Sequence, residues 1–401
     1  MGEGHDAVLG RAPGHGRGPG PPPSPRPAGR ILRGTVRDDD AMDQALDAGA
    51  GARRRSAPNP WVGCVVVRDG EIVGRGATEP PGRAHAEVVA LRDAGDRARG
   101  ATAYVTLEPC SHHGRTPPCA DALIEAGVAR VVIALEDPDP RVAGGGIARL
   151  LDAGIEVTLG VGDTRAAADL APYLHHRRTG RPFVVAKIAA SIDGRIAAAD
   201  GSSHWLTSDT ARADAHELRA DSQAIVVGAG TALADEPRLT VRDVARPPHH
   251  PPVRVLLDAH GRVPATGPLF ATDDAPTLVV TTNAAPPAAV DAWRAAGAKV
   301  EIVAPAGDGT GVDLDELFAL LGREGVLQVL VEGGGTLLGR VLDEGHAQHV
   351  VVYVAPLALG TRGTPALAFP GPDRIADAPR LQLGSVEQLG PDVRLDYEVR
   401  T

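Results

Sequence analysis

The stretch that decides the fold of the first half of the chain is TLEPCSHHGRTPPC, residues 106–119. Its start overlaps a predicted strand over residues 103–107, which leads into the first cysteine, Cys110. Its end, Cys119, stands directly before a predicted helix over residues 120–126. Both cysteines therefore lie at a strand-to-helix connection, where the positive end of the helix dipole favours a thiolate.

A histidine joins the two cysteines. His85-Ala86-Glu87 opens another predicted helix, over residues 86–98. One imidazole and two thiolates are the three protein ligands that a catalytic zinc ion uses while its fourth position stays open to water. Glu87 follows His85 by two residues, so it is expected beside the metal and not on it, as the acid/base of a zinc deaminase.

The surrounding pattern alternates between the periods of strands and helices, which is typical of a layered α/β domain. Asp69-Gly70 is a turn of the kind that joins two antiparallel strands. Strands are predicted over residues 61–67, 72–76, 103–107, 131–135 and 156–159, and helices over residues 40–49, 86–98, 120–126 and 147–153. The polar segment RRTGRP, residues 177–182, marks a boundary, which gives domains over residues 37–180 and 181–401.

The second domain is also predicted to be α/β. Its strands are expected near residues 183–188, 224–227, 253–257, 277–280, 299–303, 327–331 and 349–354. The last strand but one leads into Gly333-Gly334-Gly335 and a helix, a turn whose backbone N–H groups suit a phosphate. A Rossmann fingerprint is rejected, because Leu233 stands where the motif after Gly228 needs Gly or Ala.

Composition narrows the function. The chain has 401 residues, a formal net charge of −10 and 3% aromatic residues, which disfavours nucleic acid as a partner. Three cysteines form no disulfide framework and suit a reducing compartment, here the cytoplasm. No apolar run is long enough to span a membrane. Residues 1–36 hold nine Gly and seven Pro, and they are expected to be a disordered extension.

The long cysteine loop resembles the deaminase domain of the bifunctional deaminase/reductase family of riboflavin biosynthesis. The resemblance extends from about residue 40 to the C-terminus. It includes Pro58-Asn59-Pro60, the His85-Ala86-Glu87 helix, Asp137-Pro138-Asp139-Pro140, Val142-Ala143-Gly144-Gly145-Gly146 and Ser191-Ile192-Asp193-Gly194-Arg195. The family implies a cytidine-deaminase-like three-layer domain followed by a dihydrofolate-reductase-like α/β domain.

The resemblance implies that the first domain deaminates 2,5-diamino-6-ribosylamino-4(3H)-pyrimidinone 5′-phosphate. His85, Cys110 and Cys119 would hold one Zn²⁺ per deaminase domain, and Glu87 would carry the proton. Asn59 would contact the pyrimidine, and His112 and Arg115 the ribose phosphate. The sequence departs from the family at Thr78, where a histidine is common, and this puts phosphate binding on that side in doubt.

For the second domain, the resemblance implies NADPH-dependent reduction of the ribosyl chain to ribityl. The residues expected to line NADPH are Ala189, Trp205, Thr231, Asp235, Gly334, Gly335, Thr336, Leu337, Leu338 and Gly339. Those expected to hold substrate are Lys187, Ser203, Arg219, Leu239, Arg242 and Glu332. Ala259 replaces a serine that is frequent in the family, which removes one possible cofactor contact. The family also suggests a homo-oligomer.

Three alternatives remain open from the residues alone. A nucleic-acid-editing deaminase would need a basic or aromatic surface for the strand. The second domain would be a non-catalytic module if NADPH caused no change in fluorescence or stability. A purely structural zinc ion would usually have four protein ligands, and Glu87 beside the three ligands argues against it.

Overall fold

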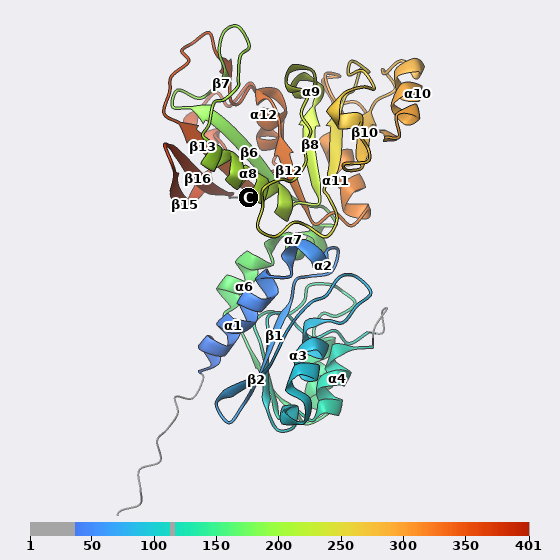
Figure 1. Cartoon of the computed structure of the whole chain (residues 1–401), viewed down its shortest axis with the longest axis vertical. Helices are drawn as coiled ribbons and strands as arrows, with labels where there is room; N and C mark the ends of the chain where they lie inside the picture. The colour runs from blue at the N-terminus through green and yellow to red at the C-terminus, as the bar shows by residue number, and fades with distance from the viewer. Residues whose placement is uncertain (1–36, 113–116, 401) are drawn as a thin grey trace, which may run out of the picture. The chain divides into compact units, whose positions relative to one another are not determined.

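The computed structural model describes residues 37–112 and 117–400. The extension expected over residues 1–36, and Arg115 in the cysteine loop, lie outside the described residues. The described chain forms a five-stranded sheet within residues 63–159 and a nine-stranded sheet within residues 183–399 (Figure 1). In these parts of the chain, no helix combines the length and apolarity that crossing a membrane requires.

The first sheet has the strand order β2-β1-β3-β4-β5. Its strands are β1 (Gly63–Arg68), β2 (Glu71–Ala77), β3 (Thr102–Val105), β4 (Arg130–Ile133) and β5 (Glu156–Leu159). Asp69 and Gly70 both have positive φ in the turn between β1 and β2, which confirms the predicted hairpin. The pairs β3–β4 and β4–β5 are parallel, so these three strands end at one edge of the sheet.

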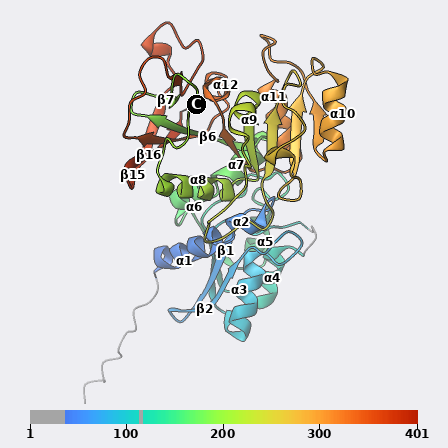
Figure 2. The same cartoon turned by 45° about the horizontal axis from the view of Figure 1, so that its top comes forward.

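Helices cover both faces of this sheet, as Figures 1 and 2 show. On one face, α1 (Asp38–Ala50) and α6 (Asp163–Asp169) pack on Val65, Tyr104 and Val132. On the other face, α3 (Ala86–Ala94), α4 (Cys119–Ala126) and α5 (Gly145–Asp152) pack on the alternate residues of the same strands. The remaining helices of this half are α2 (Arg53–Ser56) and α7 (Ala171–Thr179). The three-layer prediction is confirmed.

Several predicted elements differ by one to four residues at their ends from the elements of the structure. The helix predicted over residues 86–98 ends at Ala94, because Gly95 has a φ of +55° and a 3₁₀ turn follows it. The strand predicted from residue 61 begins only at Gly63. The helix predicted over residues 120–126 does end at residue 126, because Gly127 follows it in the left-handed conformation, with a φ of +69°.

The second sheet has the order β11-β10-β9-β8-β12-β6-β13-β16-β15, and all seven predicted strands are present. They are β6 (Phe183–Ser191), β8 (Ala224–Gly228), β9 (Val253–Leu257), β10 (Thr277–Thr281), β11 (Lys299–Ile302), β12 (Gln328–Glu332) and β13 (His349–Ala355). These seven pair in parallel. Their parallel course places the carboxyl ends of β9, β8, β12 and β6 along one edge.

Helices also cover both faces of the second sheet. Strand residues alternate between a core shared with α11 (Leu314–Arg323) and α12 (Gly335–Asp343) and a core on the opposite face. That opposite core packs under α8 (Asp209–Asp221), α9 (Ala229–Asp235) and α10 (Pro287–Ala295). A separate two-stranded sheet pairs β7 (Arg195–Ala197) with β14 (Thr364–Pro365).

The C-terminal hairpin was not predicted from the sequence. It pairs β15 (Leu381–Leu389) with β16 (Asp392–Val399), and β16 joins β13 in antiparallel register. The register of β15 shifts between Leu383 and Ser385. This irregularity breaks the apolar alternation that would have identified the strand.

Candidate functional site

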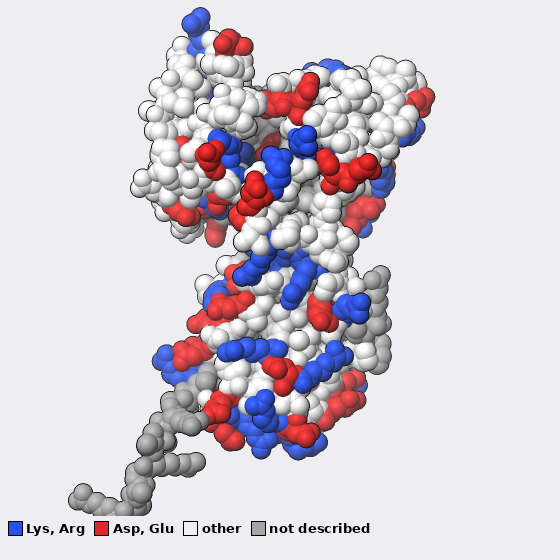
Figure 3. Space-filling view, viewed as in Figure 1, with Lys and Arg blue, Asp and Glu red and all other residues white. Residues whose placement is uncertain are grey.

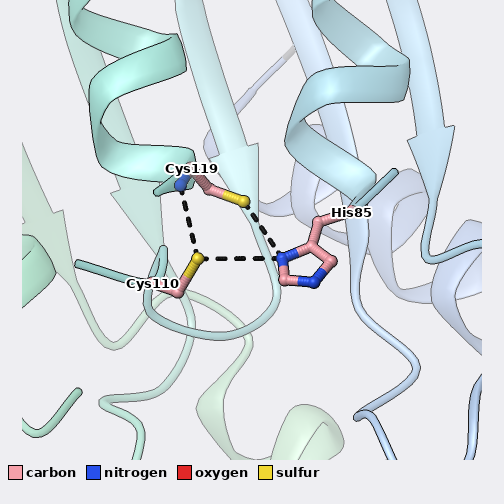
Figure 4. A group of neighbouring side chains, drawn as sticks. All are labelled: His85, Cys110 and Cys119. Carbon is pink, nitrogen blue, oxygen red and sulfur yellow. Dashed lines mark hydrogen bonds between the residues drawn. The ribbon is translucent and has the colours of Figure 1, made fainter. Parts of the chain in front are cut away.

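The three expected metal ligands meet at one end of the first sheet. His85 immediately precedes α3, Cys119 is the first residue of α4, and Cys110 lies in the loop after β3. Their ligand atoms lie within 4.8 Å of one another. His85 Nδ1 is 3.2 Å from Cys119 Sγ and 3.7 Å from Cys110 Sγ (Figure 4).

This donor set fits zinc. With a Zn–N bond of about 2.0 Å and Zn–S bonds of about 2.3 Å, tetrahedral coordination places ligand atoms roughly 3.5–3.8 Å apart. The backbone N–H of Cys119 donates to Cys110 Sγ at 3.3 Å. Hydrogen bonding with Cys119, and with His85, lowers the pKa of the Cys110 thiol and favours the thiolate that a metal needs. Three protein ligands leave the fourth position for water.

Glu87 lies beside this cluster in the first turn of α3. It is only 3% exposed, and the thiol of Cys119 is among the groups that influence the pKa of its carboxyl group. Burial, reinforced by the negative charge of Cys110, raises the pKa of Glu87 to about 7. A bound dication would favour the ionised form and oppose this rise. The carboxyl group is therefore buried in the first turn of α3 with a pKa near neutrality, where it can both accept and release a proton.

A second buried carboxylate, which the sequence reasoning did not identify, holds the loop next to the site. Glu108 is 4% exposed and accepts four backbone hydrogen bonds. Its donors are the N–H groups of Asp137, Gly144, Gly146 and Ile147, at 2.8–3.2 Å. Two of these N–H groups belong to the first turn of α5, so the carboxylate caps that helix from outside.

The same contact requires glycine. A Cβ atom on Gly146 would lie 1.9 Å from the backbone oxygen of Pro109, the residue between Glu108 and Cys110. The start of α5 therefore packs directly against the backbone that carries a metal ligand. Glu108-Pro109-Cys110 and Gly144-Gly145-Gly146 both stand out in the sequence, but no local pattern shows that they meet.

The structure also gives the surroundings of Asn59 and His112, which were expected to bind substrate, and of Thr78, where the sequence departs from the family. Asn59 is half-buried in the loop before β1, and His112 is half-buried after Cys110. The Nδ1 atom of His112 is buried without a hydrogen-bond partner among the described residues. Thr78 is only 2% exposed, and its hydroxyl bonds both the N–H and the oxygen of Val62. Its hydroxyl therefore joins backbone segments and is not free to bind a phosphate.

The second domain holds a cavity of about 740 Å³ at the carboxyl ends of its parallel strands. The lining contains most of the residues expected to bind cofactor or substrate there: Lys187, Ala189, Ser203, Arg219, Thr231, Asp235, Leu239, Glu332, Gly334, Gly335, Thr336, Leu337 and Leu338. Residues from five separate segments of sequence thus come together around one space. Ser203 also reaches Asp235, with 3.5 Å between Oγ and Oδ1.

A buried ion pair forms one wall of this cavity. Arg219 Nη2 donates to Glu332 Oε2 at 2.8 Å, and a second hydrogen bond joins Nε to Oε1. Lys187 Nζ lies 3.7 Å from the same carboxylate. Burial alone would raise the pKa of Glu332, but the Arg219 and Lys187 charges overcome that effect and lower it to about 2. Glu332 is therefore ionised at neutral pH and holds both cations in place.

The glycine-rich turn fits a phosphate-containing cofactor. It leads from β12 into α12, whose start has no side-chain cap and whose first residues line the cavity. The first N–H groups of a helix have no intrahelical partners. Thr231 Oγ1 accepts the N–H of Gly334 at 2.9 Å and fixes the turn against α9. A Cβ on Gly335 would lie 2.4 Å from the oxygen of Pro365. The site thus fits the pyrophosphate of NADPH.

Three expected contact residues do not line this cavity within the described part of the chain. Trp205 is 70% exposed, and the Arg212 guanidinium lies 4.3 Å from its ring centroid. Arg242 is exposed and donates to Thr240 Oγ1. Gly339 packs against the backbone of Ala368. Ala259, the departure noted above, does line the cavity but offers no hydroxyl.

Comparisons with known proteins agree with this architecture. Residues 35–135 match the family model "Cytidine and deoxycytidylate deaminase zinc-binding region", and residues 182–395 match "RibD C-terminal domain". The riboflavin biosynthesis protein RibD of Escherichia coli is 42% identical over 370 residues, which covers 90% of this chain and 99% of that protein.

Two solved structures match about nine-tenths of this chain. Acinetobacter baumannii RibD, form 1, has a TM-score of 0.82 and 38% identity, and it covers 91% of this chain and 99% of its own. The Thermotoga maritima diaminohydroxyphosphoribosylaminopyrimidine deaminase/5-amino-6-(5-phosphoribosylamino)uracil reductase has a TM-score of 0.79 and 32% identity. The match covers 90% of this chain and 99% of that chain.

We expect Glu108→Gln to destabilise the first domain and weaken its hold on zinc. The amide NH₂ would face two backbone N–H donors, which costs on the order of 2–4 kcal/mol. Thermal unfolding should occur several degrees lower, and a chelator should remove zinc faster. Glu125→Gln, on the exposed side of α4, is the matched control. If Glu108→Gln unfolds and releases zinc as the wild type does, the carboxylate does not hold this loop.

Proposed function

The chain belongs to the RibD family of bifunctional riboflavin-biosynthesis enzymes, and we propose that its two sites act in sequence on one pyrimidine ribotide. The first would deaminate 2,5-diamino-6-ribosylamino-4(3H)-pyrimidinone 5′-phosphate. The second would reduce the ribosyl side chain and give 5-amino-6-ribitylamino-uracil 5′-phosphate. The observation that carries this proposal is the presence, on one chain, of a three-ligand metal cluster with a buried carboxyl group and of a separate cofactor-sized cavity.

In the first site, zinc supplies Lewis acidity toward a water molecule when it is bound. We propose that Glu87 accepts a proton from the water as its oxygen attacks the ring carbon that carries the 2-amino group. Glu87 then returns this proton to the departing nitrogen, so the C–N bond breaks and ammonia leaves. The second proton of the water passes to the adjacent ring nitrogen as the carbonyl forms. Its burial next to Cys119 supports this role, because the carboxyl group is shielded from bulk water.

Substrate recognition in the first site is assigned by the same proposal. Asn59 would bind the pyrimidine edge, and His112 would approach the phosphate with Arg115. The Nδ1 atom of His112 has no partner in the described part of the chain, which supports a ligand-facing role, since a buried polar atom normally has a partner. With the Thr78 hydroxyl engaged by Val62, the phosphate depends on the cysteine loop.

In the second site, NADPH supplies a hydride when it is bound. We propose that the hydride goes to C1′ of the sugar while Lys187 gives a proton to the ring oxygen, so that the C1′–O bond opens. The ion pair with Glu332 supports this role, because Glu332 Oε2 lies 3.7 Å from Lys187 Nζ and holds the ammonium group in place. Ser203 and Leu239 would contact the substrate. The domains over residues 37–180 and 181–401 would be the two catalytic units.

Arg219 and Arg242 were both expected to hold substrate, and a guanidinium suits the phosphate of that substrate. The Arg219 guanidinium is already engaged by Glu332 and by the oxygen of Thr240, so we propose that it orients Glu332. Arg242 is exposed and free of acidic partners among the described residues, which leaves it as the proposed phosphate ligand. Trp205 would reach the cofactor only if the exposed segment around it moved.

The rival functions have less support. A non-catalytic second domain is not favoured, because that half of the chain matches the RibD C-terminal domain. For a nucleic-acid substrate, a basic surface would be needed, but acidic and basic side chains are interspersed on the face in Figure 3. We also propose a reducing compartment, the cytoplasm, because Cys110 and Cys119 must stay reduced to bind a metal.

The two sites should be separable by mutation. Glu87→Gln keeps the shape of the side chain but removes its proton transfer, so ammonia release should fall by about 10²–10⁴-fold. Oxidation of NADPH should remain at the wild-type rate when the deaminated ribotide is supplied. The measurement is ammonia release together with absorbance at 340 nm. Full ammonia release by Glu87→Gln would refute the proton-transfer role, and loss of both activities would refute the separation of the sites.

We further propose that the chain forms a homo-oligomer through β15, the edge strand of the second sheet. Eight of its nine residues are exposed, and Leu383 and Val386 are 51% and 60% exposed. An unpaired strand edge with apolar side chains is a surface that another strand readily covers. A second copy offers the same edge, so the pairing can be symmetric.

Introducing charge on this strand should dissociate the oligomer. Val386→Glu places carboxylates at the proposed interface, and light scattering coupled to size exclusion should then show a monomer. Ile302→Glu is the matched control, since Ile302 is 49% exposed on β11 at the opposite edge. A wild-type monomer, or an oligomer that Val386→Glu leaves intact, would contradict the proposal.

A further inference from the structure

The ammonium group of Lys187 shares its only acidic partner in the described part of the chain. Its Nζ atom lies 3.7 Å from Glu332 Oε2. Both oxygens of that carboxylate already accept hydrogen bonds from Arg219, so Glu332 serves two cations at once. A lysine side chain has a long, flexible stem, and one shared ion pair at this distance does not hold its end in a single position. A second contact must do so.

The aromatic ring of Tyr353 supplies this second contact. Lys187 Nζ lies over the ring, 5.9 Å from its centroid. Lys187 is level with Val351 on β13, and Tyr353 follows two residues later, so these side chains point to the same face of the sheet. The face of an aromatic ring attracts a cation within about 6 Å of its centroid, and it does so more strongly where water is excluded. Tyr353 is only 1% exposed, so water is excluded from its ring.

A hydrogen bond from its own hydroxyl group fixes the ring. Tyr353 Oη donates to Asp214 Oδ2, on α8, at 2.5 Å. Burial and this carboxylate both raise the pKa of the Tyr353 phenol above its usual value, so the phenol stays protonated and keeps donating. Arg394 of β16 donates to both oxygens of Asp214, at 2.8 and 3.0 Å, and compensates its charge. The ring therefore does not swing away from Lys187 unless this hydrogen bond breaks.

The same polar network ties the C-terminal hairpin to the strand that carries the ring. Arg394 also donates to Asp396 at 2.8 Å, and Asp396 Oδ1 lies 3.1 Å from His349 Nε2. His349 is the first residue of β13, which pairs with β16 along most of its length. In Figure 1, α8 lies close to β6, β13 and β16. The side chains of α8, β13 and β16 thus support a ring that faces Lys187 on β6.

Tyr353 lies behind the cavity and not in it. Lys187 and Ala189 line the cavity of the second domain, but Tyr353 is not part of that lining. An effect of the ring on the reaction must therefore pass through Lys187. The ring attracts the charge of the ammonium group as a whole, so the N–H groups stay free to donate to a substrate.

We propose that Tyr353 is a positioning residue for the reduction, whose ring holds the Lys187 ammonium group where it can reach the ring oxygen of the sugar. The inference rests on the proposed reductase function. The strand order β12-β6-β13 places Glu332 on one side of Lys187 and Tyr353 on the other. Glu332 alone would draw the ammonium group toward the like charge of Arg219. Attraction from both sides defines one position between them.

The test is the single-turnover oxidation of NADPH by the full-length, zinc-loaded protein with the deaminated ribotide. Tyr353→Leu removes the ring and should slow this step by about 10- to 30-fold, as expected for a desolvated cation–π contact. Tyr353→Phe keeps the ring and should stay within about threefold of the wild type. Phe318→Leu is the matched control and should leave the rate unchanged, because it removes another buried ring from the opposite face of the sheet. Ammonia release should be unaffected in all three variants.

A series of fluorinated phenylalanines at position 353 separates positioning from packing and does not depend on the folding of Tyr353→Leu. Fluorine barely changes the size of the ring but weakens its negative face. The rate of NADPH oxidation should therefore fall with each added fluorine, while KM for NADPH stays constant. A rate that does not respond to fluorination, or a wild-type rate in Tyr353→Leu, overturns the positioning role. If the wild type itself oxidises no NADPH with this ribotide, the reductase function is wrong instead.

Discussion

Parallel strands end at the same edge of a sheet, and both sites of this chain depend on that constraint. In the first sheet, β3 ends beside β4, so the loop with Cys110 meets the loop that leads into α5. In the second, the ends of β9, β8, β12 and β6 enclose a single cavity. Residues distant in sequence become neighbours at these edges because the strands end there together. Helices also start at these edges and supply N–H groups that have no intrahelical partner.

Buried carboxylates then fix the geometry at each edge. Within residues 37–112 and 117–400, Glu108 has only backbone N–H groups as hydrogen-bond partners, and it joins the metal-binding loop to the start of α5. Glu332 is paired with Arg219 and Lys187, so its charge is compensated within the protein. A buried charge without partners would cost several kcal/mol, which is why each carboxylate imposes one arrangement on the groups around it. Glu87 differs, because burial raises its pKa toward neutrality.

The sequence predicted the layers, the seven strands of the second domain and the grouping of the three metal ligands. These features depend on local periodicity and on a motif whose residues lie at element ends. The C-terminal hairpin was missed because the irregular register of β15 interrupts its alternation. The role of Glu108 depends on backbone groups up to 39 residues later, which no local pattern reveals. The engaged hydroxyl of Thr78 and the exposed position of Trp205 are likewise tertiary properties.

The central claim is that one chain performs two consecutive reactions on the same ribotide. The most direct measurement is a time course with the wild-type protein, zinc, NADPH and the diaminopyrimidinone ribotide, in which ammonia, NADP⁺ and the product mass are followed together. The account predicts one ammonia and one NADP⁺ for each ribotide consumed, with ammonia appearing first. Ammonia without NADP⁺, or NADP⁺ formed before any ammonia is released, would contradict it.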